Sequence, residues 1–306
     1  MSLLAVGTVA FDCVETPFGK HDDIIGGSVS YLGTSASYFT DVRMMSVIGE
    51  DFPEDTLEFF RSRKINTDGV KRLPGKTFRW RGKYTDNLNE AETLDTQLNV
   101  LTEFDPRVPE EFKNSDYLVL GNISPDLQLN VLNQVPNAKL VACDTMNFWI
   151  SGALEDLKKT LKKVNLLSIN DGEARMLSGE HNLVHAAKAI RAMGPDILII
   201  KRGEHGALAV TEEGMFSAPA MPLDVIKDPT GAGDSFAGGL MGYIARKGSW
   251  DLESLRQGVI LGSVMASYNV QDFSLERLKT LTQEDINSRY QAFANLTRFS
   301  STLDIL

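Results

Sequence analysis

The sequence of 306 residues has little cysteine and no long apolar run. Its two cysteines, Cys13 and Cys143, lie far apart and in no metal-ligand spacing, which argues against a disulfide framework and fits a reducing compartment. No stretch reaches the roughly 18 apolar residues that a membrane-spanning helix needs. The N-terminus also lacks the basic segment and apolar run of a signal peptide. We therefore expect a cytoplasmic protein with no membrane partner.

An excess of positive charge is absent as well. The 31 Lys and Arg residues are outnumbered by 41 Asp and Glu residues, which gives a net charge of −10. A protein that binds nucleic acid neutralises many phosphates with basic side chains, so we expect no nucleic-acid partner. A single nucleotide needs only a few backbone N–H groups and one cation, and the acidic balance does not exclude it.

Two common nucleotide-binding motifs are missing. The sequence contains no Gly-x-x-x-x-Gly-Lys-Ser/Thr segment, which excludes a P-loop. No Gly-x-Gly-x-x-Gly follows the first predicted strand, which argues against a Rossmann dehydrogenase. If the chain binds a nucleotide, it does so through another arrangement.

Short apolar runs alternate with helical segments along most of the chain. This order is typical of a mostly parallel sheet covered by helices. Hydrophobic residues make up 42%, enough for a sizeable core, and no repeat or linker divides the chain, so we expect one domain over residues 1–306. The predicted strands are 3–6, 42–48, 117–120, 139–143, 166–169, 197–201, 207–211 and 215–218, and the predicted helices are 28–39, 54–64, 125–133, 151–163, 183–193, 232–246, 252–268 and 284–296.

The segment 76–100 interrupts this alternation. Residues 77–84 alternate strictly, as a strand with one solvated face does, and residues 93–98 are placed to pair with them. One face of the first strand carries Phe78 and Trp80, together with Gly82 and Tyr84. A short flap cannot bury such a face alone, so it must pack on the core, a second subunit or a substrate. The opposite face is cationic: Arg79, Arg81 and Lys83 point either to solvent or to an anionic acceptor.

The segment with the most chemical information runs from Asp228 to Gly239, Asp-Pro-Thr-Gly-Ala-Gly-Asp-Ser-Phe-Ala-Gly-Gly. Pro229 cannot lie inside a helix. The turn Gly231-Ala232-Gly233 that follows leaves backbone N–H groups uncovered at a helix start, where they bind anions. Asp234 in the first turn is placed to accept a hydroxyl proton as a general base. Alternatively, it only caps the helix.

The same helix carries three further glycines, Gly238, Gly239 and Gly242. Each costs about 1 kcal/mol in a helix interior relative to alanine. Something must therefore pack very closely there, either a neighbouring helix or a ligand.

The Asp-Pro-Thr-Gly-Ala-Gly-Asp-Ser-Phe segment resembles the C-terminal signature of the PfkB carbohydrate kinases, in the ribokinase-like superfamily. The resemblance implies a three-layer α/β sandwich with a mostly parallel central sheet and a small β lid. It also implies an ATP-dependent kinase that phosphorylates a hydroxyl group of a small sugar-like molecule. Asp234 would be the catalytic base, and Gly231, Ala232 and Gly233 would form the anion hole for the phosphoryl group.

Segments near the N-terminus resemble the substrate side of the same family. Asp12 resembles a residue that grips substrate hydroxyls, and Gly26 with Gly27 resembles the double glycine at the substrate site. The resemblance implies a lid built from about 12–27 and 76–100. Because lids in relatives often pair between subunits, we expect a homodimer with Trp80 buried at its contact.

Two further segments resemble the nucleotide side. Asn170 and Glu173 resemble an element linked to Mg²⁺ and phosphate, which implies Mg²⁺ near Glu173, directly or through water. Their spacing equally fits a helix N-cap and its partner three residues later. Lys201, Gly203 and Gly206 resemble the nucleotide-binding turn before a hairpin.

A monovalent cation is the third cofactor that the resemblance implies. Asp228 and Thr230 match the Asp-x-Thr spacing that accompanies K⁺ use in the family. The alternative is that Asp228 simply caps the loop.

Departures from the family concern the acceptor. Ala10 stands where many sugar kinases of the family have Asn, and the aromatic rings of Phe11 and Tyr31 favour a base over a bare sugar. A nucleoside kinase is therefore an alternative. A non-catalytic nucleotide-binding regulator on the same fold is another, although the presence of Asp234 and its glycines argues against it.

Overall fold

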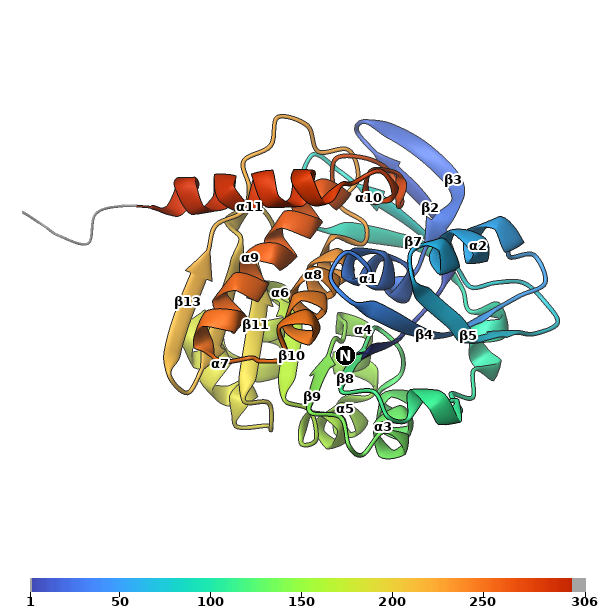
Figure 1. The fold of residues 1–306 in the computed structure, drawn as a ribbon, viewed down its shortest axis with the longest axis horizontal. Coiled ribbons are helices and arrows are strands. Elements are labelled where there is room, and N and C mark those ends of the chain that lie inside the picture. The colour runs from blue at the N-terminus through green and yellow to red at the C-terminus, as the bar shows by residue number, and fades with distance from the viewer. Residues whose placement is uncertain (1, 299–306) are drawn as a thin grey trace, which may run out of the picture.

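The computed structural model describes residues 2–298, which form two β sheets covered by helices (Figure 1). Seven neighbouring strands of the larger sheet run parallel, and an antiparallel hairpin extends it at one edge. In spatial order its nine strands are β13 (Gly214–Ala218), β12 (Ala207–Thr211), β11 (Ile197–Lys201), β10 (Leu166–Asn170), β9 (Leu140–Cys143), β8 (Tyr117–Leu120), β1 (Ser2–Val6), β4 (Asp41–Ile48) and β5 (Ile65–Arg72).

Both faces of this sheet are buried, as parallel sheets require. In β1, Leu3 and Ala5 belong to the core on one face, and Leu4 and Val6 belong to the core on the other. The first core is covered by α1 (Ser28–Ala36), α2 (Glu54–Ser62), α8 (Ala232–Lys247), α9 (Leu252–Asn269), α10 (Glu276–Lys279) and α11 (Gln283–Thr297). The second is covered by α3 (Pro125–Gln134), α4 (Asn147–Gly152), α5 (Leu154–Leu161), α6 (Asp171–Ser178), α7 (Leu183–Arg191), η1 (Asn99–Glu103) and η2 (Glu110–Phe112).

The predicted three-layer α/β sandwich is therefore confirmed, with most element boundaries shifted by only a few residues. The strand β5 was not predicted. Its residues alternate between buried and exposed and lie at the sheet edge, so they lack the continuous apolar run of the central strands. Within the described residues, no helix has both the length and the apolar character needed to cross a membrane.

The close-packed glycines of α8 are explained by neighbouring helices. A Cβ on Gly238 would overlap the carbonyl oxygen of Leu32 in α1. A Cβ on Gly239 would lie 2.7 Å from the carbonyl oxygen of Leu261 in α9. The helix α8 fits between α1 and α9 because the positions that face them are glycines, which have no side chain. Of the two explanations offered above, a neighbouring helix or a ligand, the neighbouring helix is confirmed.

A second, four-stranded sheet contains the segments in which a lid was expected. Its order is β3 (Gly19–Gly26), β2 (Ala10–Thr16), β6 (Arg79–Tyr84) and β7 (Ala91–Gln97). The strands β6 and β7 pair antiparallel, and β6 also pairs in parallel with β2, which brings two distant parts of the sequence together. Figure 1 shows this small sheet beside α1 and α10, at the opposite end of the molecule from β13.

Candidate functional site

The start of α8 forms the floor of the candidate site. The preceding residue, Gly231, has a φ of +75°, which favours glycine. A Cβ at this position would also overlap the ring of Tyr31, which is a second reason for glycine. The side-chain amide of Asn269 donates to the carbonyl oxygen of Thr230 at 2.7 Å and holds the turn. No side chain caps this helix start in the described part of the chain. The N–H of Ala232 donates to the carbonyl oxygen of Pro229 at 3.1 Å, while among the described residues the N–H groups of Gly231 and Gly233 remain free to bind an anion.

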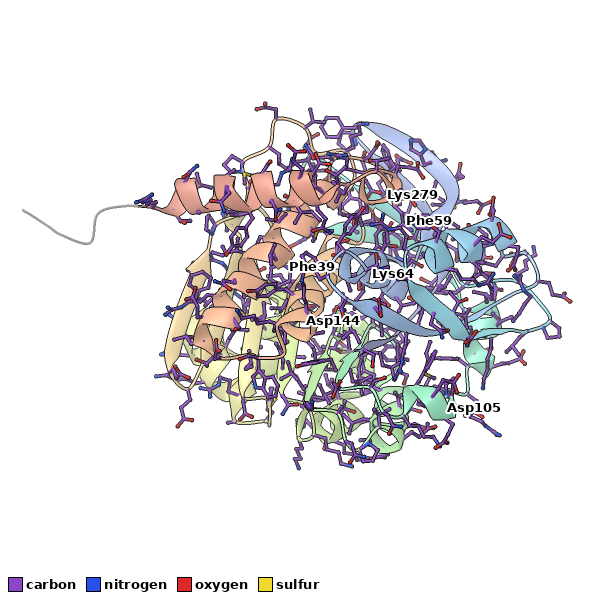
Figure 2. All side chains as sticks on the ribbon, in the orientation of Figure 1. Phe39, Phe59, Lys64, Asp105, Asp144 and Lys279 are labelled. Atoms are coloured by element: carbon purple, nitrogen blue, oxygen red, sulfur yellow. The ribbon has the colours of Figure 1, made fainter. Side chains whose placement is uncertain are left out.

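A buried ion pair lies beside this helix start. Nζ of Lys201, at the end of β11, is 3.6 Å from Oδ2 of Asp144, and both side chains are largely buried. The same Nζ is 2.9 Å from the position that a Cβ on Gly233 would occupy. Asp144, labelled in Figure 2, directly follows β9. The pair thus lies where parallel strands end, the edge at which open α/β sheets bind ligands.

Asp144 was not among the predicted site residues. The available signal was its position directly after the apolar run 139–143. That position alone does not distinguish a site residue from an ordinary turn residue. Only the tertiary structure brings it to Lys201.

Asp234 lies in the first turn of α8, as predicted. Burial raises the pKa of its carboxyl group to about 8, and the negative charges of Asp144 and Asp12 add to this rise, while Lys201 opposes it. A carboxyl group with a pKa near the working pH is suited to accept a hydroxyl proton.

The predicted acceptor-side residues lie together in the small sheet, near the start of β2 and the end of β3. Asp12 is only 4% exposed, and a Cβ on Gly26 would overlap its carboxylate. Gly27 has a φ of +89°, and its N–H bonds the same carboxylate. Burial, with the nearby charge of Asp228, raises the pKa of Asp12 to about 8. Since the charge of Asp12 also raises the pKa of Asp234, the two carboxyl groups lie within electrostatic range of each other.

Asn170 and Glu173 form the capping box that local sequence allowed. The N–H of Glu173 donates to Oδ1 of Asn170, and the N–H of Asn170 donates to Oε2 of Glu173, both at 2.7 Å. Burial and the charge of Asp144 raise the pKa of Glu173 to about 7. The carboxylates of Glu173 and Asp144 offer the oxygen ligands that Mg²⁺ prefers. Among the described residues no three acidic, His or Cys side chains could enclose a metal, so Mg²⁺ here would also need phosphate oxygens and water.

The predicted nucleotide turn follows β11 and includes the short helix η3 (Gly203–His205). Gly203 and Gly206 both have positive φ angles, +53° and +80°. Asn89, in the β6–β7 turn, reaches this segment: its Oδ1 accepts the N–H of Glu204 at 3.4 Å, and a Cβ on Gly203 would overlap it. The small sheet, which carries Asp12, therefore also contacts the nucleotide turn.

Asp228 caps its own loop. Its Oδ1 accepts the N–H of Thr230 at 2.9 Å, and its Oδ2 accepts the N–H of Ser274 at 3.4 Å. The Thr230 hydroxyl donates to the Tyr84 hydroxyl at 3.3 Å. The capping alternative is thus confirmed, and K⁺ binding at Asp228 and Thr230 stays a prediction.

The two aromatic residues that favoured a nucleobase do not offer stacking surfaces. The ring of Phe11 packs on Phe52 with a centroid distance of 5.6 Å, on the strand face opposite Asp12. Tyr31 is 1% exposed, with its ring against Gly231. Packing already covers both rings, so neither is a stacking platform for a base, and the nucleoside alternative itself stays a prediction.

The cationic face of β6 does not meet the acceptor. Asp12 is paired in register with Trp80, so the cations point to the opposite side of the small sheet. Each is balanced by carboxylates: Arg79 pairs with Asp23 and Asp51, Arg81 with Asp22, and Lys83 with Glu15. An anionic acceptor bound by this face is therefore not supported, and the solvated alternative holds.

Comparisons with known proteins identify the family and the fold of the chain. Residues 29–277 match the family described as pfkB family carbohydrate kinase. The chain is 30% identical over 254 residues to a cytidine kinase of Thermococcus kodakarensis, covering 79% of this chain and 88% of that protein. A nucleoside kinase of Burkholderia thailandensis in complex with inosine has a TM-score of 0.79 at 19% identity, with 96% and 99% of the two chains covered. Aminoimidazole riboside kinase from Salmonella enterica, complexed with aminoimidazole riboside and an ATP analog, has a TM-score of 0.74 at 19% identity, with 95% and 100% covered.

Proposed function

This chain belongs to the pfkB carbohydrate kinase family and has its ribokinase-like fold, and we propose that it transfers the γ-phosphoryl group of ATP to a hydroxyl group of a small sugar-like molecule. One observation carries this proposal: the uncapped start of α8, the buried ammonium of Lys201 and the carboxyl group of Asp234 converge on one space. A developing phosphoryl charge is stabilised by donors and a cation fixed in this way.

In the proposed reaction, Asp234 accepts the proton of the acceptor hydroxyl. The oxygen then forms its bond to the γ-phosphorus as the bond to ADP breaks. The N–H groups of Gly231 and Gly233, with Lys201, hold the negative charge on the phosphoryl oxygens, and Ala232 shapes the turn between them through its bond to Pro229. Little covalent work is left to the protein, and its contribution is positioning and electrostatics.

The remaining residues divide between the two ligands. Asp12, with the backbone of Gly26 and Gly27, would bind acceptor hydroxyls, since its carboxylate is buried beside them. ATP would lie along the ends of β10 and β11, against the residues Asn170, Glu173, Lys201, Gly203 and Gly206. Mg²⁺ would be held near Glu173 and Asp144 and would offset charge on the phosphates.

K⁺ is part of the proposal at the loop of Asp228 and Thr230. A cation there would steady the turn before α8 without touching the acceptor. Comparison of turnover in potassium and in tetramethylammonium buffers tests this, and identical rates would dispose of it.

A nucleoside is the second candidate acceptor. It is favoured by the cytidine kinase that is 30% identical over most of the chain. In that case the phosphorylated hydroxyl belongs to a ribose, so the roles of Asp12 and Asp234 are unchanged.

The deciding experiment is phosphoryl transfer from labelled ATP to D-ribose, D-fructose, cytidine and inosine, measured side by side. We expect transfer to at least one acceptor and none by the Asp234→Asn variant used as the control. ATP binding without transfer to any member of a broad metabolite panel would instead favour the non-catalytic regulator.

A further inference from the structure

The hydroxyl group of Tyr31 is buried without a hydrogen-bond partner. Tyr31 lies in α1, is 1% exposed, and has no partner for its hydroxyl among the described residues. Buried polar groups are nearly always paired, and an unpaired one lowers stability. This hydroxyl therefore needs an explanation.

Two other hydroxyls in α1, those of Ser30 and Thr34, are also unpaired, but each has a potential partner within its own helix. A serine or threonine hydroxyl in a helix can rotate toward the carbonyl oxygen one turn earlier. The hydroxyl of Tyr31 stands at the far end of a ring, and the base of that ring is fixed against Gly231. It cannot return to its own helix for a partner.

The surroundings of this hydroxyl belong to the acceptor side of the site. Burial raises the pKa of Tyr31 well above its ordinary value, and the negative charges of Asp12, Asp228 and Asp234 act in the same direction. The phenol therefore keeps its proton and can donate it. The neighbouring Tyr84 differs, because its hydroxyl already accepts from Thr230. Tyr31, with its ring against Gly231, thus offers a free donor within electrostatic range of the carboxyl groups that the proposed function assigns to the acceptor.

We propose that the Tyr31 hydroxyl binds a second hydroxyl group of the acceptor, one that is not phosphorylated, and so selects substrates that carry it. The inference rests on the proposed function. A donor to the attacking oxygen would reduce its nucleophilicity, so the bond must go to another hydroxyl. A site that leaves a buried polar group unpaired rejects an analogue lacking the matching group far more strongly than an apolar pocket does.

The first test needs no substrate. Tyr31→Phe keeps the ring on Gly231 and removes only the hydroxyl, so the urea midpoint of the ligand-free variant should equal or exceed that of the wild type. Tyr38→Phe is the matched control, because the buried Tyr38 hydroxyl donates to the carbonyl oxygens of Leu278 and Leu281 at 2.5 and 3.1 Å. This control should lower the midpoint. If Tyr31→Phe lowers it by as much, the hydroxyl already has a partner and the proposal is wrong.

The second test uses whichever of D-ribose, D-fructose, cytidine and inosine the wild type phosphorylates. Tyr31→Phe should raise the KM for that acceptor about 10- to 100-fold and leave the KM for ATP within about twofold. One deoxy analogue of the acceptor, such as 2′-deoxycytidine or 3′-deoxycytidine for cytidine, should be rejected by the wild type and accepted equally by the variant.

An unchanged acceptor KM in Tyr31→Phe, or discrimination among the deoxy analogues that survives the substitution, would overturn the proposal. A wild type that phosphorylates none of these acceptors would count against the proposed function instead. The unfolding comparison of Tyr31→Phe with Tyr38→Phe still tests the hydroxyl in that case.

Discussion

At the scale of single residues, acidic side chains outnumber basic ones at the candidate site. Asp144, Glu173 and Asp234 lie around one buried cation, Lys201. Burial raises the pKa of both Asp12 and Asp234 to about 8, with added repulsion from Asp228 at Asp12 and from Asp144 and Asp12 at Asp234. At neutral pH the ligand-free protein therefore holds Asp234 largely protonated, and a base must lose that proton before it can act.

The pH dependence of catalysis follows from this. We expect kcat/KM for the acceptor to rise about tenfold per pH unit below pH 8 and to level off above it. Asp144→Asn removes a negative charge that raises the pKa of Asp234, so the rising limb should move to lower pH. Rate profiles between about pH 5.5 and 9.5 measure this. A limb at the same pH in both proteins would show that the titrating group is not Asp234.

Substitution of the base tests its role directly. Asp234→Asn keeps the shape of the side chain but removes its ability to accept the proton. We expect kcat to fall by about 10²- to 10⁴-fold, with ATP affinity and the circular dichroism spectrum preserved. A variant that keeps more than about a tenth of the wild-type rate rules out a base role.

At the scale of elements, the start of α8 separates a structural glycine from a catalytic one. Gly231 has the positive φ, whereas Gly233 lies inside the helix, where a side chain would meet only the flexible end of Lys201. A substitution at Gly231 should therefore lower the stability of the fold, whereas a substitution at Gly233 should lower the rate of catalysis.

Valine substitutions distinguish the two roles. Gly231→Val should lower the melting temperature strongly, because of strain and the overlap with Tyr31. Gly233→Val should change it little and lower kcat, since it displaces Lys201 and covers the helix N–H groups. Thermal unfolding and turnover per folded molecule are the measurements. If Gly233→Val unfolds as readily as Gly231→Val while its folded fraction keeps full turnover, the division is wrong.

Elements encoded by local sequence were predictable, and those that depend on distant partners were not. The capping box of Asn170 and Glu173 is local, and so is the uncapped start of α8 after Gly231. The parallel pairing of β2 with β6 joins distant segments, and no local pattern predicts it. The roles of Asp144 and of the unpaired Tyr31 hydroxyl could not be predicted from local sequence, because they depend on residues of other elements that pack around them.

At the scale of the whole molecule, a homodimer through the small sheet stays a prediction. Trp80 is partly buried within the chain: its indole lies across Gly82, and its N–H donates to Thr93 at 3.2 Å. The adjoining strand β7 is exposed along its entire length, and Leu94 is 48% exposed. This surface is available to a second copy of the chain.

Trp80→Ala tests the assembly. Loss of the indole should loosen β6 against β7, weaken self-association and raise the acceptor KM together, because a lid without its support closes poorly. Light scattering and steady-state kinetics measure both effects. A monomeric wild type, with unchanged kinetics in the variant, would exclude the lid dimer.

The contact of Asn89 with Gly203 and Glu204 leads us to expect that the two proposed substrates bind in a thermodynamically dependent way. The sheet that carries Asp12 also rests on Gly203 and Glu204, so a nucleotide that orders this turn steadies the acceptor side as well. Linkage requires the effect to be reciprocal: the factor by which ADP tightens acceptor binding must equal the factor by which the acceptor tightens ADP. Calorimetric titrations in both orders should give one coupling factor greater than one, and Asn89→Ala should bring it toward unity. Independent affinities in the wild type would mean that the contact transmits nothing. If binding is coupled in this way, each substrate dissociates more slowly once the other has bound. A nucleotide bound without the acceptor then dissociates before water can hydrolyse it.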